Sequence, residues 1–353
     1  MKFIHTSDIR IGVSPDTDYE WGEKRKAEIE EALDNILNVC NEKDIDLLLI
    51  AGNLFAEPPS KEQLDQLDEK LKTLVKTRTV ILPGYLDYAS DSSAAVNYKF
   101  ESKTVLLPGG KTTNAYLKGI NTCVTGYGYD YPEIRSDVLG KIDPGRVSAA
   151  NILIGVGGDP NHMPFKTSEI AKKGFDYVAL GGRSKSAHIL KNRLAYSGCP
   201  EPAGPEEIGR RGYIIGEITD QGTKIGWVPC NKRSYIDINI TLSPEITPED
   251  VTTKLEEMLL KLGNENIYTI IFKGFADPNF APDLKRIKER YLIRNIENLT
   301  INSRDEEKIL EENGANIIGS FVTEIRECYN IDENIREKAM RYGLEALIMS
   351  GEN

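Results

Sequence analysis

Short apolar runs that stop at glycine, proline or aspartate recur along the first 240 residues, and stretches with helical periodicity separate several of them. The run Leu47 to Ala51 is apolar throughout and is followed by Gly52. Such a run is typical of a central strand buried on both faces. Glu23 to Asn41 carries its apolar residues at helical spacing instead. This alternation predicts a layered α/β domain, in which the loops at strand ends carry the chemistry.

A second pattern begins after residue 240. The segment Thr247 to Asp250 combines an N-cap residue, a first-turn proline and an acidic first turn, and it predicts the start of a helix. We then expect a strand over Tyr268 to Phe272, a helix over Pro282 to Tyr291 and a strand over Asn298 to Ile301. Helical patterns fill most of the chain beyond residue 306. The sequence therefore predicts three parts: residues 1–240, a smaller α/β domain over 241–310, and C-terminal helices over 311–353.

The charge balance bears on the class of partner. The chain of 353 residues has 44 Lys and Arg against 55 Asp and Glu, a net charge of -11. This balance argues against a protein that is basic all over its surface and coats nucleic acid, while a local basic groove remains compatible with it. No apolar run approaches the roughly 20 residues of a membrane-spanning helix. No signal-peptide core follows Met1. We therefore expect a cytoplasmic protein that does not associate with membranes.

Polar or glycine-rich loops follow five of the expected strands, and two further loops are rich in glycine and proline. The loops are Thr6-Ser7-Asp8-Ile9-Arg10, Ala51-Gly52-Asn53-Leu54-Phe55, Pro83-Gly84-Tyr85-Leu86-Asp87, Gly155-Val156-Gly157, Gly181-Gly182-Arg183-Ser184, Tyr196-Ser197-Gly198-Cys199-Pro200-Glu201-Pro202 and Glu207-Ile208-Gly209-Arg210-Arg211-Gly212-Tyr213. In order and spacing they resemble the motifs of SbcD-type DNA-repair nucleases, which belong to the calcineurin-like metallophosphoesterase family. The resemblance extends to about residue 218, and the order of elements after residue 240 is similar to the capping domain of that family.

The resemblance implies a β-sandwich flanked by helices, a capping domain, and two Mn²⁺ or other divalent metals that cleave phosphodiesters. Two such metals need a bridging carboxylate together with imidazole or amide ligands. At the family's ligand positions only Asp8 keeps its residue type. The replacements are Arg10 for His, Asn53 for the bridging Asp, Tyr85 for Asn, Leu86 for the general-acid His, and Val156, Gly182 and Ser184 for His. A guanidinium has no lone pair to give a metal, whereas the scaffold residue Asp87 is kept.

This pattern predicts a degenerate, catalytically inactive SbcD-like homologue that acts as a binding or assembly subunit in DNA repair, with no catalytic residue, bound metal or cofactor. The alternative is an active metal-dependent DNA exonuclease, a phosphodiesterase that uses relocated ligands. The resemblance also implies a homodimer and a coiled-coil ATPase partner of the SbcC type.

Positive side chains stand where the relatives hold metals. The loops offer the cations Arg10 and Arg183, with Lys185 nearby, and the carboxylates Asp8 and Asp87. One interpretation is an Arg–Asp ion pair that fills the pocket. The other is that Arg10, Arg183 and Lys185 contact a phosphate or a nucleic-acid backbone without cutting it.

The three histidines offer little to rebuild a metal site. On the first strand His5 points to the face opposite Asp8, so we interpret it as a packing or hydrogen-bonding histidine. His162 is interpreted as a histidine of a surface loop, and His188, which follows the last of the glycine-rich strand-end loops, as a surface residue.

Overall fold

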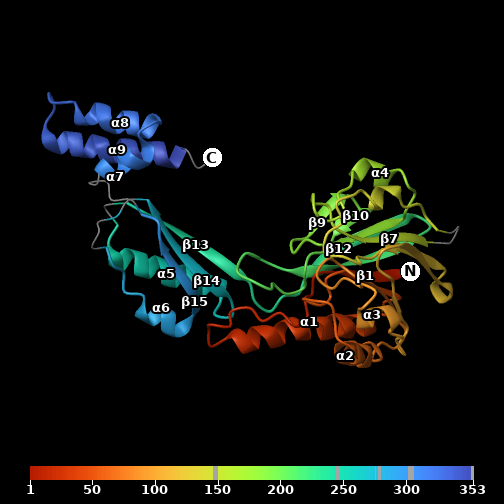
Figure 1. Cartoon of the computed structure of the whole chain (residues 1–353). Coiled ribbons are helices and arrows are strands. Elements are labelled where there is room, and N and C mark those ends of the chain that lie inside the picture. Colours follow the sequence, from red (N-terminus) through yellow and green to blue (C-terminus); the bar gives the residue numbers. More distant parts are fainter. Residues whose placement is uncertain (146–149, 244–245, 275, 277–279, 301–305, 351–353) are drawn as a thin grey trace. The chain divides into compact units, whose positions relative to one another are not determined.

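The chain forms two compact units, Met1–Tyr235 and Ile236–Asn353, in a computed structural model that describes residues 1–145, 150–243, 246–274, 276, 280–300 and 306–350 (Figure 1). Both units combine sheets with helices, so the predicted α/β class is confirmed. The boundary expected at residue 240 falls within strand β13 (Tyr235–Leu242), and the one expected at residue 310 falls within helix α7 (Glu306–Asn313).

Two six-stranded sheets make up the first unit. The first sheet has the order β12-β11-β1-β2-β3-β4 and the second has the order β5-β6-β7-β8-β10-β9. The strands of the first sheet are β1 (Lys2–Thr6), β2 (Leu47–Ala51), β3 (Arg78–Leu82), β4 (Thr104–Leu106), β11 (Gly212–Thr219) and β12 (Gly222–Pro229). Those of the second are β5 (Thr112–Leu117), β6 (Thr122–Tyr127), β7 (Ala150–Val156), β8 (Tyr177–Gly181), β9 (Ala187–Leu190) and β10 (Leu194–Tyr196).

The two sheets pack face to face, and helices cover the outer face of the first. Successive side chains of a strand point to opposite faces. In β2, Leu47 and Leu49 accordingly join the core between the sheets, while Leu48 and Ile50 join the core beneath the helices. The helical elements of this unit are α1 (Gly22–Glu42), α2 (Lys61–Leu71), α3 (Ala94–Asn97), α4 (Thr167–Ala171) and the short 3₁₀ turns η1 (Lys118–Ile120) and η2 (Leu139–Lys141).

The parallel strands of the two sheets end at one shared edge. Strands β1, β2 and β3 run parallel, as do β7 and β8, so the loops that follow them emerge together. The main chains pack tightly there, since a Cβ added to Gly181 would lie 1.8 Å from the carbonyl oxygen of Ala51. The edge brings together the loops that carry Asp8, Asn53 and Gly182.

Four buried charged side chains tie helix α1 to two distant loops. Arg25 Nη1 lies 2.7 Å from both Glu28 Oε2 and Glu201 Oε1, and Arg233 Nε donates to Glu28 at 2.8 Å. Glu201 also accepts hydrogen bonds from the backbone N–H groups at residues 232 and 233. The cluster fixes the loop after β10 and the end of the first unit against α1. The sequence analysis did not predict any of these ion pairs.

The second unit contains a three-stranded sheet in the order β13-β14-β15 and the described helices. Its elements after β13 are α5 (Pro248–Leu262), β14 (Ile267–Gly274), α6 (Lys285–Arg290), β15 (Leu292–Asn298), α7, α8 (Ile317–Arg326) and α9 (Glu333–Ser350). Apolar residues of the sheet, α5 and α6 form one core, and α7 to α9 form a second, smaller one.

The last strand of this unit lies earlier than the sequence predicts. We expected it over residues 298–301, of which residue 301 lies outside the described residues, but β15 ends at Asn298 and pairs in parallel with β14. The strand begins directly after α6, because parallel pairing sets Leu292 opposite Ile267 of β14. In the part of the chain that the structure describes, no helix has the length and apolar character needed to cross a bilayer.

Candidate functional site

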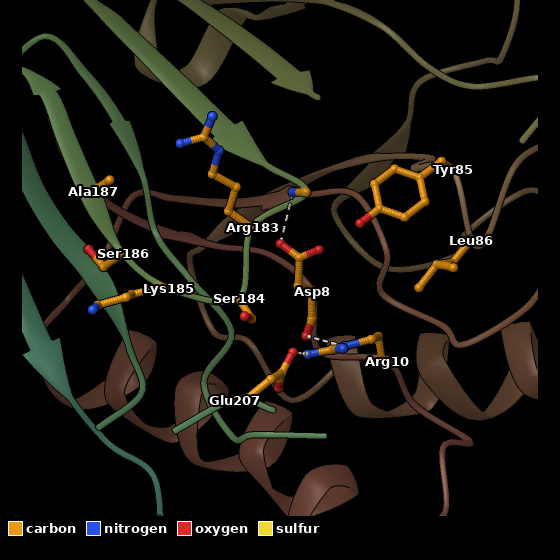
Figure 2. A pocket seen from close by; sticks show the side chains of 11 residues that line it. Asp8, Arg10, Tyr85, Leu86, Arg183, Ser184, Lys185, Ser186, Ala187 and Glu207 are labelled. Carbon is orange, nitrogen blue, oxygen red and sulfur yellow. Dashed lines mark hydrogen bonds and ion pairs between the residues drawn. The ribbon is translucent and has the colours of Figure 1, made fainter. Parts of the chain in front are cut away.

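A pocket of about 490 Å³ opens at the shared edge of the two sheets (Figure 2). Most of the residues singled out from the sequence line it, and Asn53, Asp87 and Val156 lie buried next to those that do. The lining residues are Asp8, Arg10, Tyr85, Leu86, Gly182, Arg183, Ser184, Lys185, Ser186, Ala187 and Glu207. The loops of both sheets therefore contribute to one site.

Asp8 is buried at the pocket wall, and three donors engage its carboxylate. Ser7 Oγ and the backbone N–H of Gly182 donate to Oδ2 at 2.7 and 2.9 Å, and Asn53 Nδ2 donates to Oδ1 at 2.8 Å. Burial raises the pKa of Asp8, and the hydrogen bonds from Asn53 and Ser7 oppose that shift. Both carboxylate oxygens are thus already used within the protein.

Asn53 and Asp87 act as ties between loops. The amide oxygen of Asn53 accepts the backbone N–H of Leu86 at 3.0 Å. Asp87 accepts four backbone N–H groups, those of residues 53, 54, 55 and 84, at 2.6 to 3.2 Å. Burial raises the pKa of Asp87 to about 6 against these hydrogen bonds. The two side chains hold the end of β2 against the end of β3.

The partner of Arg10 is Glu207, rather than the aspartates considered from the sequence. Arg10 Nη2 lies 2.5 Å from Glu207 Oε1, and Arg10 Nε donates to the carbonyl oxygen of Asp8 at 3.3 Å. The other oxygen of Glu207 accepts the backbone N–H of Ala203 at 2.7 Å. Arg10 thus does not form the Arg–Asp ion pair of the first interpretation, and its carboxylate comes from the loop before β11.

Three residues at this edge other than glycine have left-handed backbone. Asp8, Arg10 and Asn53 have φ values of 55°, 58° and 51°. The left-handed region is unfavourable for most residues other than glycine, although Asp and Asn adopt it more often, so Arg10 is the least expected of the three. Strained backbone of this kind clusters at functional sites, where the surrounding structure holds it in place. Here the hydrogen bonds from residues 8, 10 and 11 to the carbonyl groups of residues 52, 53 and 54 hold it.

Apolar and aromatic side chains stand at three of the compared positions, Tyr85, Leu86 and Val156. Val156 is fully buried, and a Cβ added to Gly52 would lie 2.3 Å from its Cγ2. The ring of Tyr85 packs against that of His162 at a tilt of 31°, with centroids 4.1 Å apart, and burial raises the pKa of Tyr85 to about 12. His162 Nδ1 lies 2.8 Å from Asp159 Oδ2. The Asp159–His162 pair was missed in the sequence, where only its spacing of three residues could have indicated it.

Arg183 and Lys185 are exposed on the other side of the pocket. The guanidinium of Arg183 lies over the ring of Tyr196, 4.4 Å from its centroid, and in Figure 2 it extends away from Asp8. Among the described residues, neither Arg183 nor Lys185 forms an ion pair with a carboxylate. Ser184 lies between them and accepts the backbone N–H of Cys199 at its carbonyl oxygen.

The site does not gather the donors of a metal centre. Within the described ranges, no three His, Cys, Asp or Glu side chains come together in a way that could hold a metal ion. The hydroxyl, amide and guanidinium groups around Asp8 are instead hydrogen-bonded to carboxylates.

Comparison with known proteins adds little to this geometry. No protein-family model matches the chain. One solved structure that it resembles is described as "GAP50 the anchor in the inner membrane complex of Plasmodium", with 10% identity over 65% of this chain and 84% of the other and a TM-score of 0.39. A likeness at that score carries no argument about fold or function.

Proposed function

We propose that this chain is a degenerate, catalytically inactive SbcD-like metallophosphoesterase homologue that works as a binding or assembly subunit, in DNA repair. The proposal includes the calcineurin-like type of the sandwich and rests on the strand-end motifs of the sequence. By that resemblance we further propose a cytoplasmic location, a homodimer and a coiled-coil ATPase partner.

The observation that carries the proposal is the state of Asp8, the one residue that keeps the family's residue type at those positions. Its two oxygens accept three hydrogen bonds from Ser7, Asn53 and Gly182. These bonds take three of the roughly four lone-pair sites of the carboxylate, and within the described residues Asp8 does not come together with two further His, Cys, Asp or Glu side chains that could hold a metal ion with it. The donor set does not fit two metals, because a bridging ion pair needs anionic oxygens and imidazoles around it.

The surrounding side chains support the same conclusion. Arg10 places a permanent positive charge next to Asp8, and Glu207 neutralises that charge. Val156 places two methyl groups against Gly52 and Gly182, where the relatives would carry an imidazole. The scaffold of the loops persists while the chemistry of their side chains has changed, as expected for a site kept for binding.

The test is metal content together with hydrolysis. The purified chain is incubated with Mn²⁺, desalted and analysed by inductively coupled plasma mass spectrometry, and it is assayed on labelled single- and double-stranded DNA and on bis-p-nitrophenyl phosphate. We expect substoichiometric metal and no turnover above that of the Asp8→Ala variant. Two tightly bound metals per chain, with turnover abolished in Asp8→Ala, would establish the active nuclease instead.

A further inference from the structure

The turn between β8 and β9 presents a row of free backbone donors. Gly182 has a φ of +92°, and its N–H donates to Asp8. The next three N–H groups, at Arg183, Ser184 and Lys185, have no acceptor among the residues that the structure describes. All three residues line the pocket. Successive backbone N–H groups in a turn can form a concave site for an anion.

The two cations of this turn are available to a ligand. Arg183 is held by its stacking over Tyr196, and Lys185 lies two residues further along, exposed to solvent. In the described part of the chain neither is neutralised by a carboxylate. Arg10 differs from them, because Glu207 pairs with it at 2.5 Å. The free positive charge of the pocket therefore belongs to the β8–β9 turn.

We propose that residues 182–186 form a phosphate-binding cradle that takes the dianionic phosphate group of a phosphomonoester without any metal. This inference rests on the proposed function, since it gives the inactive site its ligand class. The N–H groups of residues 183–185 and the hydroxyl of Ser184 bind the phosphate oxygens, and Arg183 and Lys185 supply the charge.

The charge count favours a monoester over a diester. Two cations without partners match the two charges of a phosphomonoester, whereas a phosphodiester carries a single charge. Asp8 and Glu207, the carboxylates that line the same pocket, are already engaged by donors of the protein. The same phosphate chemistry could come from inorganic phosphate, from a nucleoside monophosphate or from the 5′ end of a DNA strand.

Isothermal titration calorimetry in EDTA tests the cradle. Inorganic phosphate, phenyl phosphate, dimethyl phosphate and an oligonucleotide with or without a 5′-phosphate are titrated into the whole chain. We expect phenyl phosphate to bind at least tenfold more tightly than dimethyl phosphate. In the double variant Arg183→Gln/Lys185→Gln the Kd should rise at least tenfold, because each lost hydrogen bond to a charged group changes the Kd by roughly that factor. Lys191→Gln, an exposed change outside the pocket, is the matched control.

The outcomes separate this inference from the proposed function. Unchanged affinity in the double variant, or equal affinity for the mono- and diester, would overturn the cradle. Absence of phosphate binding both in EDTA and with Mn²⁺ would also overturn it and would leave the proposed function standing. Phosphate binding that requires Mn²⁺ would overturn both. A preference among the bound ligands identifies the source of the phosphate.

Discussion

The buried histidine of the first strand makes the free energy of unfolding of the first unit depend on pH. His5 is fully buried between the two sheets, and its Nδ1 lies 2.9 Å from the hydroxyl of Tyr177. Burial lowers the pKa of His5 to about 3, and a backbone hydrogen bond at Leu180 opposes the shift. The unfolded chain takes up this proton below about 6.5, whereas the folded chain does so only near pH 3.

The sign and size of the effect follow from these two values. The stability that neutral His5 provides is complete above pH 6.5 and is lost as the pH falls toward 3. At pH 5, about 1.5 pH units below the ordinary histidine value, protonation stabilises the unfolded chain by about 2 kcal/mol. Asp87 acts in the opposite direction, since its raised pKa of about 6 favours the folded chain at low pH. Comparison with a variant cancels that contribution.

The assay is urea unfolding at pH 8 and pH 5, followed by tryptophan fluorescence. Both tryptophans of the chain, Trp21 and Trp227, lie in the first unit, so the signal reports that unit. Between the two pH values the wild-type protein should lose about 2 kcal/mol more of unfolding free energy than His5→Gln. The control is His188→Gln, because His188 is exposed and its replacement should leave the wild-type pH profile unchanged.

Parallel profiles for the wild type and His5→Gln would refute the reasoning, since they would mean that His5 titrates alike in the folded and unfolded chain. A smaller but measurable difference would place the folded pKa between 3 and 6.5.

Two further substitutions test the packing that positions the site. Arg25→Met removes the cation shared by two buried glutamates and should cost about 3–5 kcal/mol in urea unfolding, whereas Lys61→Met, in an exposed pair, should cost under about 1 kcal/mol; similar costs would contradict the assigned burial. Gly52→Ala combines a positive φ with a clash against Val156 and should lower the free energy of unfolding by about 2–5 kcal/mol. The control is Gly174→Ala, which has a similar φ but no neighbour within 4 Å and should cost about 1–2 kcal/mol. Thermal unfolding of both variants measures the difference.

The sequence predicted those strands and helix starts whose signals lie within a few neighbouring residues. The apolar run Leu47 to Ala51 is a fully buried central strand, and Thr247 forms the expected cap with Asp250 in a reciprocal capping box. The sequence placed strand β15 too late, over residues 298–301 in place of Leu292–Asn298. Its residues alternate only weakly in polarity, and their position is set by parallel pairing with β14, a long-range contact that periodicity does not reveal.

The site could be anticipated as a set of loops but not as a set of contacts. Asp8, Arg10 and Gly182 follow strands whose ends meet, and parallel pairing alone brings them to one edge. The partner of Arg10 comes from Glu207, about two hundred positions away, and the sequence offers several carboxylates that could have filled that role. Which one does so depends on side-chain packing in three dimensions.

The buried cluster around Arg25 limits where the chain can be shortened without destabilising the first unit. A shortened chain that stopped before residue 231 would omit the guanidinium of Arg233 and the backbone donors that satisfy Glu201, and it would leave acidic groups uncompensated in the interior. Recombinant fragments of the first unit should therefore extend through Tyr235, whose hydroxyl donates to Asp16.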